Sequence, residues 1–175
     1  MPDERIGILA ANTARQYGRD PFRVSREKGI TVLFRDDFTA QKGAFTTVSG
    51  QMFIFINSRL SDEMQRLVCA HELGHALLHR NIRGAFLEFA LFDTADHLEY
   101  EANLFAADFL LSDEDVRTLA LEGADALSMA RNLNTNVNLL LLKLSQMNLR
   151  GAGFHLPRLV RADFLKNVTD DSGVL

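Results

Sequence analysis

The stretch RLVCAHELGHALLHRN, residues 66–81, decides how the rest of the chain is interpreted, because it contains the pentapeptide HELGH. Ser61 precedes it as a good N-cap and is followed by two acidic residues, so we predict one helix over residues 61–80. Residues four apart on a helix lie about 40° apart around the axis and about 6 Å apart along it. His71 and His75 can therefore point their imidazoles at one metal ion.

Glu72 lies about 100° around the helix from His71, in a direction from which its carboxylate can act on a water held by the metal. We therefore predict that Glu72 is a catalytic general base and not a ligand. His79 continues the series, but a helix rises about 12 Å between His71 and His79, which is too far for both to bind one ion through bonds of about 2 Å. The third ligand must come from another part of the chain.

A simpler interpretation is that this helix carries a buried stripe in which both histidines are hydrogen-bonded within the core. Two buried imidazoles on adjacent turns would then need separate partners, whereas one metal ion satisfies both, so we prefer the metal site. Cys69, the one cysteine of the chain, lies about 200° around the helix from His71 and is interpreted as a packed thiol.

The third ligand is sought in LEYEANLFAADFLL, residues 98–111, which we predict to be a second helix crossing the first. Glu99 shares a helical face with small or polar residues that permit a close approach and, through the asparagine, support the site: Ala102, Asn103 and Ala106. Glu101 points about 200° away. We choose Glu99 as the ligand and keep Glu101 as the alternative. A capping box beginning at Asp96, in which Glu99 satisfies its own helix N-terminus, is the structural alternative.

Two histidines and a glutamate, with water in the fourth position, are the ligands of catalytic zinc in thermolysin-like enzymes. We expect one Zn²⁺ per chain, held by His71, His75 and Glu99, although iron and manganese bind the same types of ligand. A purely structural zinc would need a fourth protein ligand, and the sequence offers no convincing one.

The remaining sequence predicts an α+β protein. Two helices are expected at residues 4–17 and 21–28, the second with Asp20 as N-cap. Three segments rich in β-branched and aromatic residues are expected to be strands, with Ser49-Gly50 forming a hairpin before the last, in a small, mainly antiparallel sheet: residues 30–34, 43–48 and 51–57. The last strand could bind substrate backbone by edge addition, although a core strand is the simpler interpretation.

The whole composition is typical of a globular protein, with 175 residues, 47% hydrophobic and 24% charged. The acidic start has too short an apolar run for a signal peptide, no stretch approaches the roughly 20 apolar residues of a membrane span, and one cysteine excludes an intrachain disulfide. We therefore expect a cytoplasmic protein without a membrane partner.

The C-terminal part is predicted to be helical over residues 112–148, with breaks near Gly123 and Asn134. Residues 128–147 have the outline of a DNA-binding helix-turn-helix, but their leucine-rich second helix has few side chains that read bases. The net charge of −4 gives no general attraction to phosphates. We expect packing or protein docking there, and no direct nucleic acid binding. AFLEFALF, residues 85–92, is interpreted either as a cover over the site or as a core segment.

HELGHALLH followed by EYEANLFAADFLL resembles the ImmA/IrrE family of metallo-endopeptidases, in which an HExxH helix precedes a Glu-x-x-Ala-Asn-x-Phe-Ala helix. The two short N-terminal helices and the strands before the metal helix extend the likeness over most of residues 1–150. The resemblance implies a zincin-like core, with zinc held by His71, His75 and Glu99 and with Glu72 as the catalytic glutamate. We divide the chain into this core, a helical C-terminal subdomain and a flexible tail: residues 1–112, 113–165 and 166–175.

The resemblance further implies a zinc-dependent endopeptidase, a hydrolase that cuts a helix-turn-helix transcriptional repressor and so acts as an anti-repressor of a mobile element or stress response. The Leu-Leu-Met-Pro ending common in the family is replaced here by Leu110-Leu111-Ser112-Asp113, which affects how the C-terminal helices join. The alternative function is a metal-containing binding module that sequesters a repressor without cleaving it. The two functions differ in whether they need Glu72.

Overall fold

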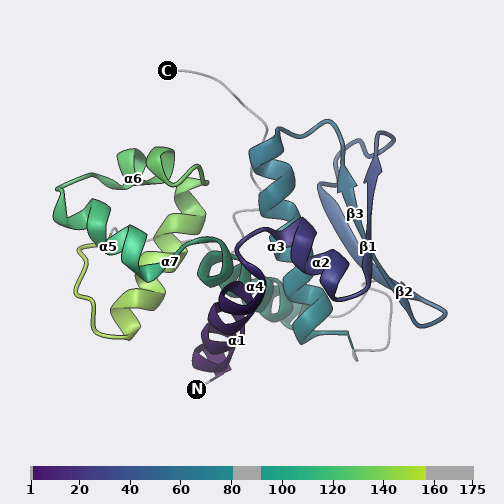
Figure 1. Ribbon diagram of the computed structural model, residues 1–175, viewed down its shortest axis with the longest axis horizontal. Coiled ribbons are helices and arrows are strands. Elements are labelled where there is room, and N and C mark those ends of the chain that lie inside the picture. The colour runs from purple at the N-terminus through teal and green to yellow at the C-terminus, as the bar shows by residue number, and fades with distance from the viewer. Residues whose placement is uncertain (1, 81–91, 157–175) are drawn as a thin grey trace.

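The structure, a computed structural model, describes residues 2–80 and 92–156. The α+β class predicted from the sequence is confirmed, since helices pack against one side of a small sheet (Figure 1). In chain order the elements are α1 (Pro2–Tyr17), α2 (Pro21–Glu27), β1 (Ile30–Arg35), β2 (Gly43–Val48), β3 (Gln51–Asn57), α3 (Asp62–Leu78), α4 (Phe92–Leu110), α5 (Asp113–Leu121), α6 (Ala126–Asn132) and α7 (Val137–Leu149).

Local sequence signals set the limits of several elements. Asp20 caps α2 and Ser61 caps α3, each by accepting hydrogen bonds from backbone amides of the first turn. Ser49 and Gly50 have φ angles of 51° and 81°, the left-handed values that a two-residue hairpin of type I′ requires. The predicted caps and hairpin are confirmed.

The sheet has the strand order β1-β3-β2 and is mixed. β2 pairs antiparallel with β3, whereas β1 pairs parallel with β3, so the prediction of a mainly antiparallel sheet is wrong for β1. The chain reverses between β1 and β2 and again between β2 and β3, and two reversals return β3 to the direction of β1. β3 is the central strand, which rules out edge addition of a substrate to β3.

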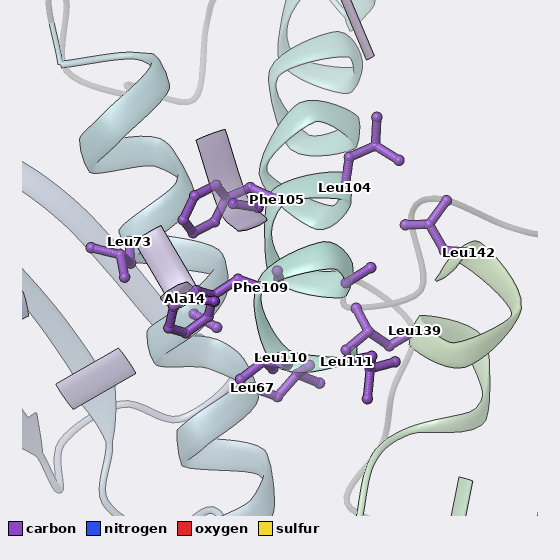
Figure 2. Packing of buried hydrophobic residues seen from close by; sticks show 14 of the residues in the cluster. Ala14, Leu67, Leu73, Leu104, Phe105, Phe109, Leu110, Leu111, Leu139 and Leu142 are labelled. Atoms are coloured by element: carbon purple, nitrogen blue, oxygen red, sulfur yellow. The ribbon is translucent and has the colours of Figure 1, made fainter. Parts of the chain in front are cut away.

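α4 lies at the centre of the helical packing. It contacts α3 on one side and α1 and α7 elsewhere, and α3 in turn covers β2 and β3. In Figure 2, Phe105 and Phe109 of α4 lie toward Leu73 of α3, while Leu139 of α7 lies on the other side of α4. The two phenyl rings are stacked with centroids 5.7 Å apart, and both side chains are fully buried. The position of α4 is therefore fixed from both sides.

The C-terminal helices are separated where the sequence indicates, because Gly123 and Asn134 adopt positive φ angles between α5, α6 and α7. The leucines of α7 are mostly buried, which supports packing over base reading for this helix: Leu139, Leu140, Leu142 and Leu144. The division at residue 112 stays a prediction. The predicted tail, and all of AFLEFALF except Phe92, lie outside the described residues. Among the helices described, none is long and apolar enough to cross a membrane.

Candidate metal centre

The two helices that carry the predicted ligands cross closely at Gly74 of α3. A Cβ atom added to Gly74 would lie 3.1 Å from both the Cα and the carbonyl oxygen of Ala102 on α4. The small residues of both helices thus allow the close approach that the sequence predicts. This crossing brings His71 and His75 of α3 opposite Glu99 of α4.

Three side chains converge at this crossing. The Nε2 atoms of His71 and His75 are 3.1 Å apart, and they lie 3.2 Å and 3.3 Å, respectively, from the two carboxylate oxygens of Glu99. Both imidazoles are buried, whereas the Glu99 side chain keeps 27% of its exposure. Within the described part of the chain, no fourth protein ligand joins this group. The arrangement leaves one side open to solvent, as catalytic metal sites require.

The contacts of the two Nδ1 atoms determine how each imidazole ring is oriented. His71 Nδ1 donates to Asn103 Oδ1 at 2.9 Å, and His75 Nδ1 lies 3.0 Å from His79 Nδ1. When Nδ1 carries the proton in both rings, both Nε2 atoms point lone pairs toward the Glu99 carboxylate. Such donors repel one another unless a positive charge lies among them, and a divalent cation is the charge that two imidazoles and a carboxylate suit. Hydrogen bonds within the core account for these contacts as well, whereas the meeting of three possible ligand atoms within 4.8 Å of one another is the arrangement that a metal site needs.

Burial and charge set the protonation of the cluster. Burial lowers the pKa of His75 to about 4. Burial also opposes protonation of His71, but its hydrogen bond to Glu99 and the charges of Glu72 and Glu99 leave the pKa of His71 above its ordinary value. Burial works to raise the pKa of Glu99, yet hydrogen bonds from both histidines hold it well below its usual range. Glu99 is therefore ionised.

Glu72 lies beside this cluster and not within it. It lines a cavity of about 210 Å³ together with His71, Glu99 and four neighbours: Ala40, Lys42, Gly43 and Val68. Burial, supported by the charge of Glu99, raises the pKa of Glu72 to about 7, although His71 and an amide hydrogen bond from Phe45 act in the other direction. A carboxyl group with a pKa near neutrality can accept and return a proton.

Comparison with known proteins places this geometry in a family. A family model of peptidases, described as the IrrE N-terminal-like domain, matches residues 25–145, a range that includes α3 and α4. The chain belongs to the ImmA/IrrE family of metallopeptidases. Membership of this family implies a metal, and the cluster of His71, His75 and Glu99 is compatible with one.

Two curated relatives are similar over shorter stretches. The "uncharacterized immunity region protein 2" of Bacillus phage phi105 is 43% identical over 61 residues, which are 35% of this chain and 39% of that protein. The metallopeptidase ImmA of Bacillus subtilis strain 168 is 38% identical over 64 residues, 37% of each chain. The match spans less than two fifths of either relative.

In this ImmA/IrrE member the two candidate glutamates of α4 have separate partners. Glu101 turns away from the cluster, with its Oε2 2.8 Å from His79 Nε2 and its Oε1 3.0 Å from His97 Nε2. The capping box is wrong, because α4 begins at Phe92 and Asp96 therefore lies inside the helix. The packed-thiol interpretation of Cys69 is confirmed by complete burial, which raises its pKa to about 12.

Sequence reasoning missed the contribution of β2. The carbonyl of Lys42 accepts a hydrogen bond from the Asn57 amide, and hydrogen-bonding groups alternate along an antiparallel strand. Gly43 and Phe45 therefore present their backbone groups to the open edge, where the Phe45 amide reaches Glu72. The available signal was the glycine, since a glycine in a strand often marks a close approach by another group.

Proposed function

We propose that the chain is a zinc-dependent endopeptidase in which His71, His75 and Glu99 hold one Zn²⁺ and Glu72 is the general base. The observation that carries this proposal is the convergence of two imidazole Nε2 atoms and the Glu99 carboxylate next to a second, buried carboxyl group, that of Glu72. Ligands and base come from HELGH and α4, the parts matched by the peptidase family model.

A bound Zn²⁺ would supply Lewis-acid polarisation of the scissile carbonyl and a water of lowered pKa. Glu72 takes a proton from the attacking water and returns it to the leaving amine. Asn103 holds the His71 ring through Nδ1, so that Nε2 faces the cavity. The amide of Phe45 holds the Glu72 carboxylate at the edge of β2.

We also propose that substrate pairs with the open edge of β2 as an extended strand. The outward edge at Gly43 and Phe45 lies next to Glu72, which is bonded to the Phe45 amide, so a peptide that pairs with the remaining backbone groups would run past the base and the cluster. This places the edge-addition role on β2 in place of β3. Main-chain pairing gives little sequence preference, so selectivity would come from pockets for alternate side chains.

For the substrate itself we propose a helix-turn-helix repressor, which would place the reaction in the cytoplasm. Support comes from the family resemblance, and one similar protein is named for the immunity region of a phage. Cleavage of the repressor would relieve repression. The alternative, sequestration without cleavage, uses the same fold and metal cluster but has no role for Glu72 as a base.

The test combines metal content and cleavage. Elemental analysis under metal-limited conditions should give about one zinc per chain for the wild type, and less for His71→Ala and Glu99→Ala. A repressor encoded beside the chain's gene is then incubated with wild type and Glu72→Gln. Cleavage by the wild type alone supports the enzyme. Relief of repression in cells by both proteins, without cleavage, would establish the binding module, and a metal-free wild type would refute both.

A further inference from the structure

A line of hydrogen-bonded side chains runs from His75 to the surface. His75 Nδ1 lies 3.0 Å from His79 Nδ1, and His79 Nε2 lies 2.8 Å from Glu101 Oε2. The other oxygen of Glu101 lies 3.0 Å from Nε2 of His97, whose side chain is 60% exposed. His79 itself is only 3% exposed.

A metal bound to His75 would fix the order of donors along this line. If His75 Nε2 is to bind a metal, the proton of the neutral ring must be on Nδ1, which then donates to His79 Nδ1. His79 Nδ1 is thereby an acceptor, so the His79 proton is on Nε2 and is donated to Glu101. The carboxylate of Glu101 accepts, and it cannot donate when ionised. Each hydrogen bond thus requires the next.

We propose that His79 and Glu101 are positioning residues for the metal ligand His75, holding its ring with Nδ1 protonated and Nε2 directed at the metal. The inference rests on the proposed function, because it assumes that His75 is a ligand. His79 lies too far away to be a third ligand, but in this inference it holds a ligand by a hydrogen bond. Glu101 then supports His79, whereas Glu99 binds the metal.

The two ligands are held in unlike ways. Asn103 accepts from His71 directly, in one step and without a charge. His75 is held through a second imidazole backed by a carboxylate, which also raises the electron density of the ligand ring. Partners of this kind commonly change metal affinity about 10- to 100-fold when removed. The contact depends on the crossing of α3 and α4, since His79 ends the first helix and Glu101 lies on the second.

The test measures zinc affinity by competition with a chromophoric chelator. His79→Leu replaces the acceptor Nδ1 of His79 with an apolar side chain of moderate size, and we expect zinc binding to weaken about 10- to 100-fold. His79→Asn places a carbonyl oxygen near the Nδ1 position, where it can accept from His75, and should restore most of the affinity. His155→Leu, the same substitution at an exposed site after α7, is the matched control and should leave affinity unchanged.

A second readout separates positioning from packing. Nitrogen-15 NMR of the histidine rings in the zinc-free protein distinguishes the Nδ1–H and Nε2–H tautomers, and we expect a larger Nδ1–H fraction for His75 in the wild type and in His79→Asn than in His79→Leu. Equal zinc affinity of wild type and His79→Leu, or an unchanged tautomer in that variant, would overturn the inference and leave the proposed function standing. If the wild type binds zinc but cuts no peptide, and His79→Leu binds zinc more weakly, the inference is supported and the enzyme is refuted.

Discussion

Gly43 of β2 lies directly against Glu72 of α3. A Cβ atom on Gly43 would come within 2.8 Å of Glu72 Oε1 and 2.4 Å of Val68 Cγ1. Strand and helix therefore meet without a side chain between them, and this contact holds the proposed base at the edge of the sheet. The φ angle of Gly43 is not in the left-handed region, so glycine is needed here for space and not for backbone conformation.

Gly43→Ala should impair both activity and stability. The added methyl group must displace Val68 or the Glu72 carboxylate, and inserting a methyl group into a packed site typically costs about 1–3 kcal/mol. We expect a lower free energy of unfolding in urea and a peptidase rate reduced at least about tenfold. Because Val68→Ala removes the nearest atom, the double variant should be more stable than the sum of the single effects predicts. Strict additivity would show that the two residues do not compete for this space.

Gly74→Ala tests the helix crossing. Alanine favours a helix by about 1 kcal/mol over glycine, so in an isolated helix the change would stabilise. Here the new methyl group would meet the backbone of Ala102 at 3.1 Å, and backbone cannot rotate away. We expect α4 to move outward by a few tenths of an ångström, weakening zinc binding through Glu99. Calorimetry with zinc measures the effect, and a variant that binds zinc as tightly as wild type would contradict it.

The parts of the fold that depend on neighbouring residues could be predicted from the sequence, including the caps at Asp20 and Ser61 and the hairpin at Ser49-Gly50. The direction of β1 could not, because strand pairing across the sheet is decided by contacts distant in sequence. The sequence predicts the start of α4 six residues too late, at 98 in place of Phe92, because the first turns of this helix lack a clear capping signal.

In the candidate site, too, some relationships can be predicted from the sequence and others cannot. Helical periodicity is enough to place His71, His75 and Glu72 relative to one another, and to separate Glu99 from Glu101 on α4. The pairing of His79 with Glu101 and the approach of Gly43 to Glu72 arise only when α3 meets α4 and β2. Such contacts lie between elements, and the separation of two residues in the sequence does not determine how close they come when they belong to different elements.

Glu72→Gln should change how the stability of the metal-free protein depends on pH. Burial raises the pKa of Glu72 from 4.5 to about 7, so between these values the folded chain holds a proton that the unfolded chain has lost. Stability therefore falls as pH rises through this window, by an amount on the order of 3 kcal/mol. Glutamine has no such proton, so the free energy of unfolding of the variant should rise relative to that of the wild type from pH 4.5 to pH 8. Urea unfolding at several pH values measures this difference.

Glu63→Gln is the control for that experiment, since Glu63 is exposed in the first turn of the same helix. Its stability should run parallel to that of the wild type across the same pH range. A Glu72→Gln curve that also runs parallel would show that burial does not hold a proton on Glu72. The proposed base would then be an ordinary ionised carboxylate.

Asp108 joins the core helices to the C-terminal helices through a buried ion pair. Its Oδ1 lies 2.6 Å from Lys143 Nζ of α7, and its Oδ2 lies 3.4 Å from Arg150. Lys143 also lies 2.6 Å from Asp113, whose side chain is 45% exposed. Removing one member of a buried pair leaves the other charge without compensation, which typically costs about 3–5 kcal/mol.

Asp108→Ala should therefore lower the free energy of unfolding, but by less than the roughly 3–5 kcal/mol of a fully uncompensated charge, because the buried Lys143 keeps its ion pair with the partly exposed Asp113. Lys143→Met should cost less, since Asp108 keeps Arg150 and methionine fills the space of the lysine stem. If Asp108→Leu combined with Lys143→Met is at least as stable as Asp108→Ala alone, the cost lies in the unpaired charge and not in the lost contact. Urea unfolding of the four proteins decides between these explanations, and equal stability of Asp108→Ala and wild type would show that the pair contributes nothing to the junction.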